Sequence, residues 1–214
     1  MNSLPKRLIQ FDVDSTFIQQ EVIELLAAKA GVYDEVAEIT ASAMRGELEF
    51  VASLKARVWL LKGLPVNVIS QVQTEIALTD GAEELVNALH AMGHSVSLVS
   101  GGFTELISPT IARLSIQYFK ANKLGMRDGL LTGEVEGSII DGPAKATALI
   151  EFAAAAGVEL TNTVAIGDGA NDLAMMAVAG ISIAFNAKPI VVAAADLAIN
   201  EATFKNVLAL IGLK

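Results

Sequence analysis

The sequence predicts an α/β fold with a doubly wound, Rossmann-like parallel sheet, and three observations support this prediction. Short apolar runs typical of buried strands alternate with segments of helical periodicity along most of the 214 residues. A block with only helical patterns interrupts the alternation after the first strand. A stretch of short alternating runs with four glycines, 118–140, indicates a β-hairpin excursion.

The strands of the sheet are predicted from short apolar runs that are bounded by turn residues. Because helical patterns separate these runs, we expect parallel strands joined by crossover helices. The predicted strands are 8–11, 95–99, 163–166, 181–185 and 197–199.

The core helices are predicted from apolar periodicity together with start and stop residues. Asp80 and Glu83 stand at capping-box spacing at the start of the first of these helices, and Gly93 ends it. Pro143 and Gly157 bracket the second, as expected for a helix that begins with proline and ends at glycine. The predicted core helices are 82–92, 143–157, 171–179 and an amphipathic last helix around 204–211.

Residues 17–76 show helical patterns and no strand pattern. An all-helical block between the first two strands of a parallel sheet indicates an insertion, which we expect to cover the functional site as a cap. The core would then consist of residues 1–16 and 77–214. The predicted cap helices are 20–30, 33–44, 47–61 and 66–76.

The composition restricts the class of protein. A hydrophobic content of 53% with only 18% charged residues favours a compact globular body. The net charge of -9 argues against nucleic acid and anionic membrane as partners, since both require a basic face. No apolar run reaches membrane-spanning length, and the stretch 1–6 is too short for a signal peptide. We therefore expect a cytoplasmic protein without disulfides, because the chain has no cysteine, and keep a homodimer open.

Two carboxylates, Asp12 and Asp14, follow the first predicted strand, and Ser15 and Thr16 come directly after them. Their side chains would point the same way if the extended path continued. Carboxylates that close together need a cation or a shared proton, and Mg²⁺, which prefers oxygen ligands, suits such a site. The pair alone is not specific, because the same pattern occurs in turns, calcium loops and sugar-nucleotide sites.

Further polar residues follow other predicted strands. In open parallel sheets, ligands bind beyond the carboxyl ends of the strands. Ser100 and Asp168 stand at two such ends, and Lys145 lies in the first turn of a helix that can point at the same crevice. Gly101 and Gly102 have no Cβ, so the backbone there can approach a ligand closely. We therefore expect these residues and the paired carboxylates to share one pocket.

The ordered motifs D-x-D-S-T, S-G-G, K and G-D-G-A-N-D resemble those of the haloacid dehalogenase superfamily of phosphatases, and within it the phosphoserine phosphatases. The resemblance covers nearly the whole chain. It implies that Asp12 attacks phosphorus to give an aspartyl-phosphate and that Asp14 is the general acid and base. It also implies Mg²⁺ held by Asp12, the backbone carbonyl of Asp14 and Asp168. Asp172 would not bind the metal directly but would interact with the residues that do.

The same resemblance assigns the residues that hold the substrate phosphate. Lys145 would neutralise its charge, and the Ser100 hydroxyl and the Gly101 N–H would donate to its oxygens. Asn171 would lie near the phosphate as an uncharged donor.

The cap is expected to select the ester. Arg57 can clamp a carboxylate with two hydrogen bonds, and Glu21 can pair with an ammonium group, which together suit an amino acid. Phosphoserine phosphatases have an arginine and a glutamate at matching positions, with an apolar lining that corresponds to Met44 and Phe50. The alternative is that Arg57 and Glu21 are surface charges and that Met44 and Phe50 are cap core.

Other motif interpretations fail on chemistry. A calcium loop starting at Asp12 requires glycine and glutamate where the chain has Phe17 and Ile23. A dinucleotide site requires a third glycine where the chain has Asp172, which would repel a pyrophosphate. A dehalogenase lacks the second carboxylate of the pair, so Asp14 favours phosphate esters.

We therefore expect Mg²⁺-dependent hydrolysis of O-phospho-L-serine to L-serine and phosphate, the last step of serine biosynthesis. The alternatives are the same chemistry on phosphohomoserine or a phosphosugar, a phosphomutase, and a non-catalytic phosphate-sensing module. Relatives often carry an N-terminal regulatory domain, whereas this chain begins close to its first predicted strand, so feedback by serine through such a domain is not expected.

Overall fold

A computed structural model of the chain describes residues 5–213. Residues 1–4, which include most of the stretch considered above as a signal peptide, and residue 214 lie outside this description. The centre of the fold is one seven-stranded sheet with the order β4-β3-β2-β1-β5-β6-β7, and all its pairs are parallel except β3–β4. The strands are β1 (Leu8–Asp12), β2 (Ser95–Phe103), β3 (Tyr118–Arg127), β4 (Leu130–Glu136), β5 (Thr163–Gly167), β6 (Ile181–Phe185) and β7 (Leu197–Ile199).

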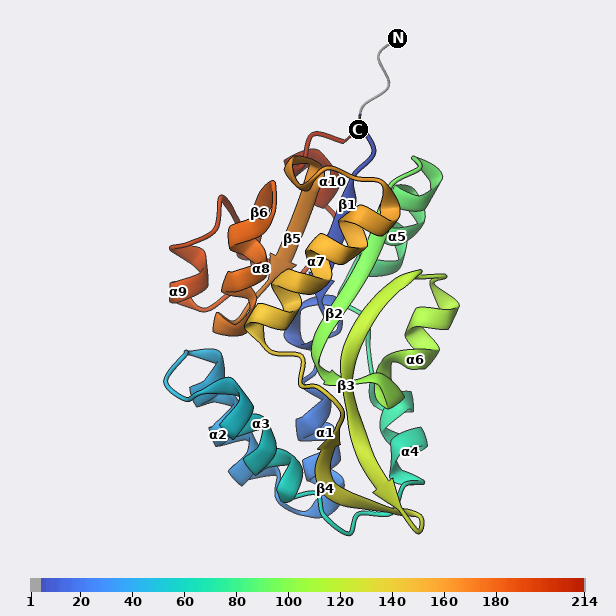
Figure 1. The fold of residues 1–214 in the computed structure, drawn as a ribbon, viewed down its shortest axis with the longest axis vertical. Helices are drawn as coiled ribbons and strands as arrows, with labels where there is room; N and C mark the ends of the chain where they lie inside the picture. The colour runs from blue at the N-terminus through green and yellow to red at the C-terminus, as the bar shows by residue number, and fades with distance from the viewer. Residues whose placement is uncertain (1–4, 214) are drawn as a thin grey trace.

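Helices cover both faces of the sheet, so the predicted doubly wound α/β fold is confirmed (Figure 1). Strand side chains alternate between the two faces, which explains the continuous apolar runs of the central strands. One apolar layer contains α7 (Gly142–Ala156), α8 (Leu173–Val178) and the short α9 (Pro189–Val192). The other contains α5 (Ala82–Ala91), α6 (Thr104–Arg113) and α10 (Val207–Leu210).

The predicted helical block lies beyond the carboxyl ends of the central strands, at the far end of the molecule from the C-terminus in Figure 1. Its apolar side chains are continuous with the core layer that contains α5 and α6. The two chain segments that connect the block to the sheet pair with each other, because the Gln19 N–H donates to Ala77 O and the Thr79 N–H to Phe17 O. The four helices are α1 (Val22–Ala30), α2 (Tyr33–Met44), α3 (Phe50–Trp59) and α4 (Val68–Glu75).

The predicted hairpin is present as β3 and β4, and it extends the sheet because β3 also pairs with β2. Its turn uses Asp128 and Gly129, both with positive φ, as a tight two-residue hairpin requires. The far end of the hairpin also contacts the helical block: the Gly63 N–H donates to Leu131 O and the Leu131 N–H to Leu64 O. The hairpin therefore connects the sheet to the loop between α3 and α4.

Several predicted helix boundaries are wrong for identifiable reasons. The capping box before α5 is absent, because Gly81 at φ 79° precedes the helix and the Asp80 carboxylate instead binds Thr203 and Lys205. The helix predicted from 47 begins at Phe50, because the Glu49 carboxylate accepts from the first backbone N–H groups. The helices predicted over 20–30 and 66–76 are also shorter.

Near the C-terminal end of the chain, two predicted helices are shorter than expected. The helix predicted over 171–179 is a 3₁₀ turn, Ala170–Asp172, followed by α8. The last predicted helix is only the four-residue α10, and Phe204 lies before it, packed on Phe185. The α6 helix was missed; Pro109 inside it is a residue that normally indicates a helix break. None of the helices in residues 5–213 combines the length and apolar character needed to cross a bilayer.

Candidate active site

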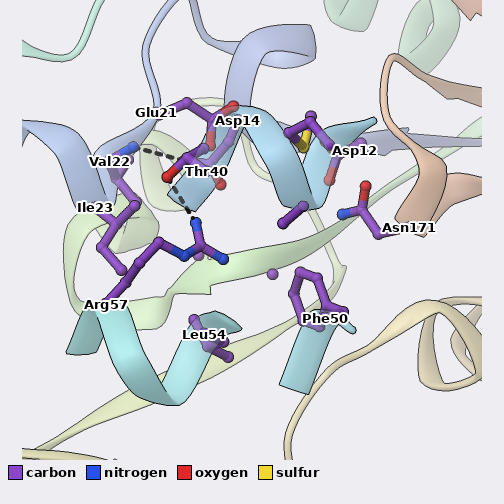
Figure 2. A pocket seen from close by; sticks show the side chains of 14 residues that line it. Asp12, Asp14, Glu21, Val22, Ile23, Thr40, Phe50, Leu54, Arg57 and Asn171 are labelled. Carbon is purple, nitrogen blue, oxygen red and sulfur yellow. Dashed lines mark hydrogen bonds between the residues drawn. The ribbon is translucent and has the colours of Figure 1, made fainter. Parts of the chain in front are cut away.

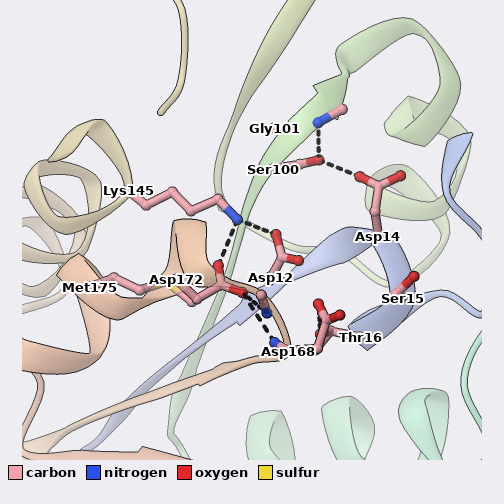
Figure 3. A network of polar contacts seen from close by, with 12 residues as sticks. Asp12, Asp14, Ser15, Thr16, Ser100, Gly101, Lys145, Asp168, Asp172 and Met175 are labelled. Atoms are coloured by element: carbon pink, nitrogen blue, oxygen red, sulfur yellow. Dashed lines mark hydrogen bonds and ion pairs between the residues drawn. The ribbon is translucent and has the colours of Figure 1, made fainter. Parts of the chain in front are cut away.

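The two paired carboxylates are placed by a sharp turn at the end of β1. The strand ends at Asp12, and residues 13–17 form a tight turn in which Ser15 takes a left-handed conformation with φ 56°. The strand alternation that was expected to align Asp12 and Asp14 therefore does not continue. The turn brings the two side chains to different partners around the same crevice, as Figure 3 shows.

Lys145 connects Asp12 to the third motif. It lies in the first turn of α7, where Asp141 caps the helix by accepting from the Ala144 N–H. Its ammonium group is fully buried and donates to Asp12 Oδ1 and, at 2.7 Å, to Asp172 Oδ1. Burial alone would lower the pKa of Lys145, but the charges of Asp12 and Asp172 outweigh it and raise the pKa above its ordinary value. Lys145 is therefore a permanent cation beside Asp12.

Asp172 closes the turn that carries Asp168. One of its carboxylate oxygens accepts from the backbone N–H groups of Asp168 and Gly169 at 3.1 and 3.2 Å. Gly167 is required at the preceding position, because a Cβ there would overlap the Asp172 carboxylate. The other side of the turn is held by Thr16, whose hydroxyl donates to Asp168 Oδ1 at 3.3 Å.

The residues present fit a divalent cation. Oxygen atoms of Asp12, Asp168 and Asp172 all lie within 4.8 Å of one another in a buried cluster. Burial, reinforced by the Asp172 charge, raises the pKa of Asp168 to about 7 and that of Asp12 well above its ordinary value. Lys145 supplies a single positive charge to three carboxylates, so a hard cation with oxygen ligands would complete the charge balance.

Both carboxylate oxygens of Asp14 are occupied. The Val22 N–H donates to Oδ1 at 2.8 Å, and the Ser100 hydroxyl donates to Oδ2 at 2.8 Å. Burial nevertheless raises the pKa of Asp14 above its ordinary value, and these hydrogen bonds only reduce the shift. Lys145 pairs with Asp12 and not with Asp14, so Asp14 is the member of the pair that is suited to carry and deliver a proton.

The serine-glycine-glycine loop forms a bulge in β2, which continues to Phe103 rather than ending at Val99 as predicted. The Gly102 N–H donates to Ser100 Oγ at 2.7 Å, so the Ser100 hydroxyl connects the loop to Asp14. The Phe50 ring lies directly over Gly101, because a Cβ there would be 2.7 Å from the ring.

Asn122, which the sequence analysis missed, fixes this bulge. It is buried in β3, and its amide donates to Gly101 O at 2.8 Å while its oxygen accepts from the Ile140 N–H at 2.8 Å. One side chain therefore joins the bulge to the segment that leads into α7 and Lys145. The available signal was an amide at an inward-facing position of an otherwise alternating strand.

The predicted cap residues line a pocket together with core residues (Figure 2). Arg57 is only 5% exposed, and Glu21 accepts from the Ser15 hydroxyl at 2.6 Å. Burial, followed by the charge of Asp14, raises the pKa of Glu21 to about 8. Met44 lies against Gly169, so its methyl group contacts the turn that carries Asp168.

The structure brings the twelve predicted site residues to one place. Those that line the pocket are Asp12, Asp14, Glu21, Met44, Phe50, Arg57, Gly101 and Asn171. Asn171 Oδ1 is buried and has no hydrogen-bond partner within residues 5–213, so this acceptor is free for a donor group of a ligand. Those that lie buried beneath the lining are Ser100, Lys145, Asp168 and Asp172.

A parallel α/β sheet with paired carboxylates after β1, a buried lysine and an acidic turn after β5 is typical of one class of hydrolases. A sequence model of the haloacid dehalogenase-like hydrolases matches residues 9–177, and the chain belongs to this family.

Within this family, the chain is similar over most of its length to several phosphoserine phosphatases. The phosphoserine phosphatase of Streptococcus thermophilus is 50% identical over 92% of this chain and 91% of its own length. That of Streptomyces coelicolor is 53% identical over 97% of this chain, which spans only 51% of that relative's length. A solved structure described as a phospho-aspartyl intermediate analogue of phosphoserine phosphatase has a TM-score of 0.94 at 42% identity, covering 99% of this chain and 100% of its own. The resemblance predicted from the motifs is confirmed.

Proposed function

We propose that the protein hydrolyses O-phospho-L-serine to L-serine and phosphate through an aspartyl-phosphate on Asp12. The observation that carries this proposal is that the paired carboxylates Asp12 and Asp14 line the same pocket as Arg57 and Glu21 (Figure 2). The phosphate would face Asp12 and the bulge of β2, and the amino-acid end would face the cap. A pair of groups that recognise a carboxylate and an ammonium favours an amino acid over a sugar.

In the first half of the reaction, an Asp12 oxygen attacks phosphorus while the bond from phosphorus to the serine oxygen breaks. Asp14 gives its proton to that leaving oxygen, for which its raised pKa suits it. Lys145 favours the ionised form of Asp12, against the effect of burial, and orients it through their buried ion pair. The amide N–H of Asn171 and the Gly101 N–H would donate to the phosphate oxygens, and Lys145 would offset their charge.

In the second half, Asp14 is a carboxylate and takes a proton from water, whose oxygen attacks the phosphorus of the aspartyl-phosphate. Phosphate leaves, and both aspartates return to their starting states. Mg²⁺, held by Asp12, Asp168 and the Asp14 backbone carbonyl, would supply positive charge to the phosphate. All assigned residues come from one chain, so the proposed chemistry does not depend on a homodimer. We propose that the protein acts in the cytoplasm.

The test is Mg²⁺-dependent phosphate release across a panel of O-phospho-L-serine, phosphohomoserine and sugar phosphates. We expect phosphoserine to give the highest kcat/KM, and we expect removal of divalent ions with EDTA to reduce its hydrolysis to background until Mg²⁺ is restored. Hydroxylamine should also release a trapped acyl phosphate from the protein. A higher kcat/KM for a sugar phosphate would contradict the proposed substrate, and absence of a phosphoenzyme would contradict the proposed mechanism.

A prediction about Asn122 arises from the same assignment. In Asn122→Asp the oxygen that binds the Ile140 N–H remains, but the donor to Gly101 O is replaced by an acceptor. The bulge of β2 should then move away from the phosphate position, and we expect kcat/KM to fall on the order of 10-fold or more for every phosphate ester alike. Exposed Asn67→Asp is the matched control. A loss confined to phosphoserine would show that Asn122 acts on the amino-acid end instead.

A further inference from the structure

Thr40 on α2 lies in the same pocket, and no part of the proposed chemistry uses it. Its side chain is buried, being 3% exposed, and it lines the pocket beside Arg57. The hydroxyl donates to the Val36 carbonyl of its own helix at 2.9 Å. Its oxygen lone pair is therefore free to accept, and Arg57 Nη1 donates to it at 3.0 Å, as the dashed line in Figure 2 shows.

The guanidinium of Arg57 is held at two points by neutral acceptors. Nη1 binds Thr40, and Nε donates to the Ser53 carbonyl one turn earlier on α3 at 3.2 Å. Within residues 5–213, Arg57 makes no ion pair. The guanidinium therefore has no anion in direct contact. Its N–H donors that are not used by Thr40 and Ser53 are the ones that a substrate carboxylate would bind.

When Glu21 is ionised, it and Arg57 carry opposite charges in one pocket and attract each other. The Glu21 carboxylate is the strongest source of negative potential acting on Arg57, followed by Asp14. An ion pair between Arg57 and Glu21 would neutralise both groups and leave neither for a substrate. Each is instead held by a hydroxyl: Ser15 holds Glu21, and Thr40 holds Arg57.

We propose that Thr40 is a positioning residue for substrate selectivity: its hydroxyl holds the Arg57 guanidinium apart from Glu21, with its free edge presented to the carboxylate of the substrate. This inference rests on the proposed function. Thr40 would not touch the reacting atoms, and its contribution would appear only with substrates that carry a carboxylate.

The test compares two hydroxyl-free variants with a conservative one on two matched substrates. Thr40→Val keeps the shape, Thr40→Ala is a second hydroxyl-free variant in case the first folds poorly, and Thr40→Ser keeps the hydroxyl. O-phospho-L-serine is compared with O-phosphoethanolamine, which has the same phosphate and ammonium groups but no carboxylate. For the hydroxyl-free variants, we expect kcat/KM for phosphoserine to fall on the order of 10-fold, mainly through KM. Phosphoethanolamine should change less than about 2-fold, and Thr40→Ser should restore most of the loss.

Thr163→Val is the matched control. Thr163 is buried at the start of β5 and, like Thr40, donates to a carbonyl and accepts from an N–H, with Leu160 O and Gly180 N as its partners. Its replacement should leave the ratio of the two substrates unchanged. Equal losses on both substrates in the Thr40 variants, or failure of Thr40→Ser to restore selectivity, would overturn the positioning role. A wild-type protein that does not prefer phosphoserine to phosphoethanolamine would instead overturn the proposed function, and with it the carboxylate that Arg57 is held to bind.

Discussion

Replacing Asp12 by asparagine is expected to abolish phosphate release and to leave the fold intact. The amide has nearly the same shape as the carboxylate, and its oxygen can still accept from Lys145. It has no negative oxygen to attack phosphorus, so the covalent route is lost. We expect phosphate release from O-phospho-L-serine to fall at least about 10⁴-fold, since loss of a nucleophile removes the function of the whole catalytic group.

The stability of the same variant distinguishes a catalytic role from a structural one. Burial and the nearby Asp172 raise the pKa of Asp12 in the folded protein, so its ionised form is destabilised at pH values above the ordinary pKa of an aspartate. Asparagine carries no charge at any pH, and Lys145 keeps its ion pair with Asp172. Without divalent metal, the melting temperature of Asp12→Asn should therefore equal or exceed that of the wild type at neutral pH.

The matched control for Asp12→Asn is Asp34→Asn, which removes an exposed carboxylate from the first turn of α2. That change should leave phosphate release unaltered. Retention of more than about 1% of the wild-type rate by Asp12→Asn would contradict the nucleophile assignment, because the expected loss of covalent catalysis is far larger.

The core of the site was predictable because its residues stand where strands end. Topology alone brings such positions together in an open parallel sheet, so the convergence of Asp12, Ser100 and Asp168 followed from strand patterns before any family was considered. The path after Asp12 was not predictable in the same way. Strand periodicity does not predict the turn that follows Asp12, in which Ser15 is left-handed and the Asp14 carboxylate accepts from Ser100.

The residues that the sequence did not reveal are those whose partners are distant and non-periodic. Asn122 donates to the carbonyl of Gly101, which lies where the pairing of β2 with β3 is interrupted by the bulge. Nothing in the local pattern of β3 predicts that bulge. Thr40 is ordinary in an amphipathic helix until α3 brings Arg57 against it. The capping box predicted at Asp80 was wrong for a related reason. Asp80 has the right spacing, but its carboxylate binds Thr203 and Lys205, which are distant in the sequence. Local rules fail wherever a polar group has a stronger long-range alternative.

Removal of the Arg57 side chain is expected to change which esters are hydrolysed rather than whether esters are hydrolysed. In Arg57→Ala a substrate carboxylate would enter a buried pocket without its cation, which typically costs about 2–5 kcal/mol. We expect kcat/KM for O-phospho-L-serine to fall roughly 10²- to 10³-fold. An aryl phosphate, which has no carboxylate, should lose less than about 5-fold, because Arg57 lies on the side of the pocket away from Asp12 (Figure 2).

Arg57→Lys separates charge from geometry in this prediction. Lysine retains the positive charge but cannot donate two parallel hydrogen bonds, so we expect it to recover only part of the selectivity. Exposed Arg127→Ala, on the hairpin, is the control for loss of an arginine as such and should behave as wild type. Equal losses of Arg57→Ala on phosphoserine and the aryl ester would make Arg57 a structural residue of the cap. Within residues 5–213 the buried guanidinium feels the charges of Glu21 and Asp14 but makes no ion pair, so a purely structural role would give no reason for burying a cation without a direct partner. A negatively charged group of the substrate supplies that reason.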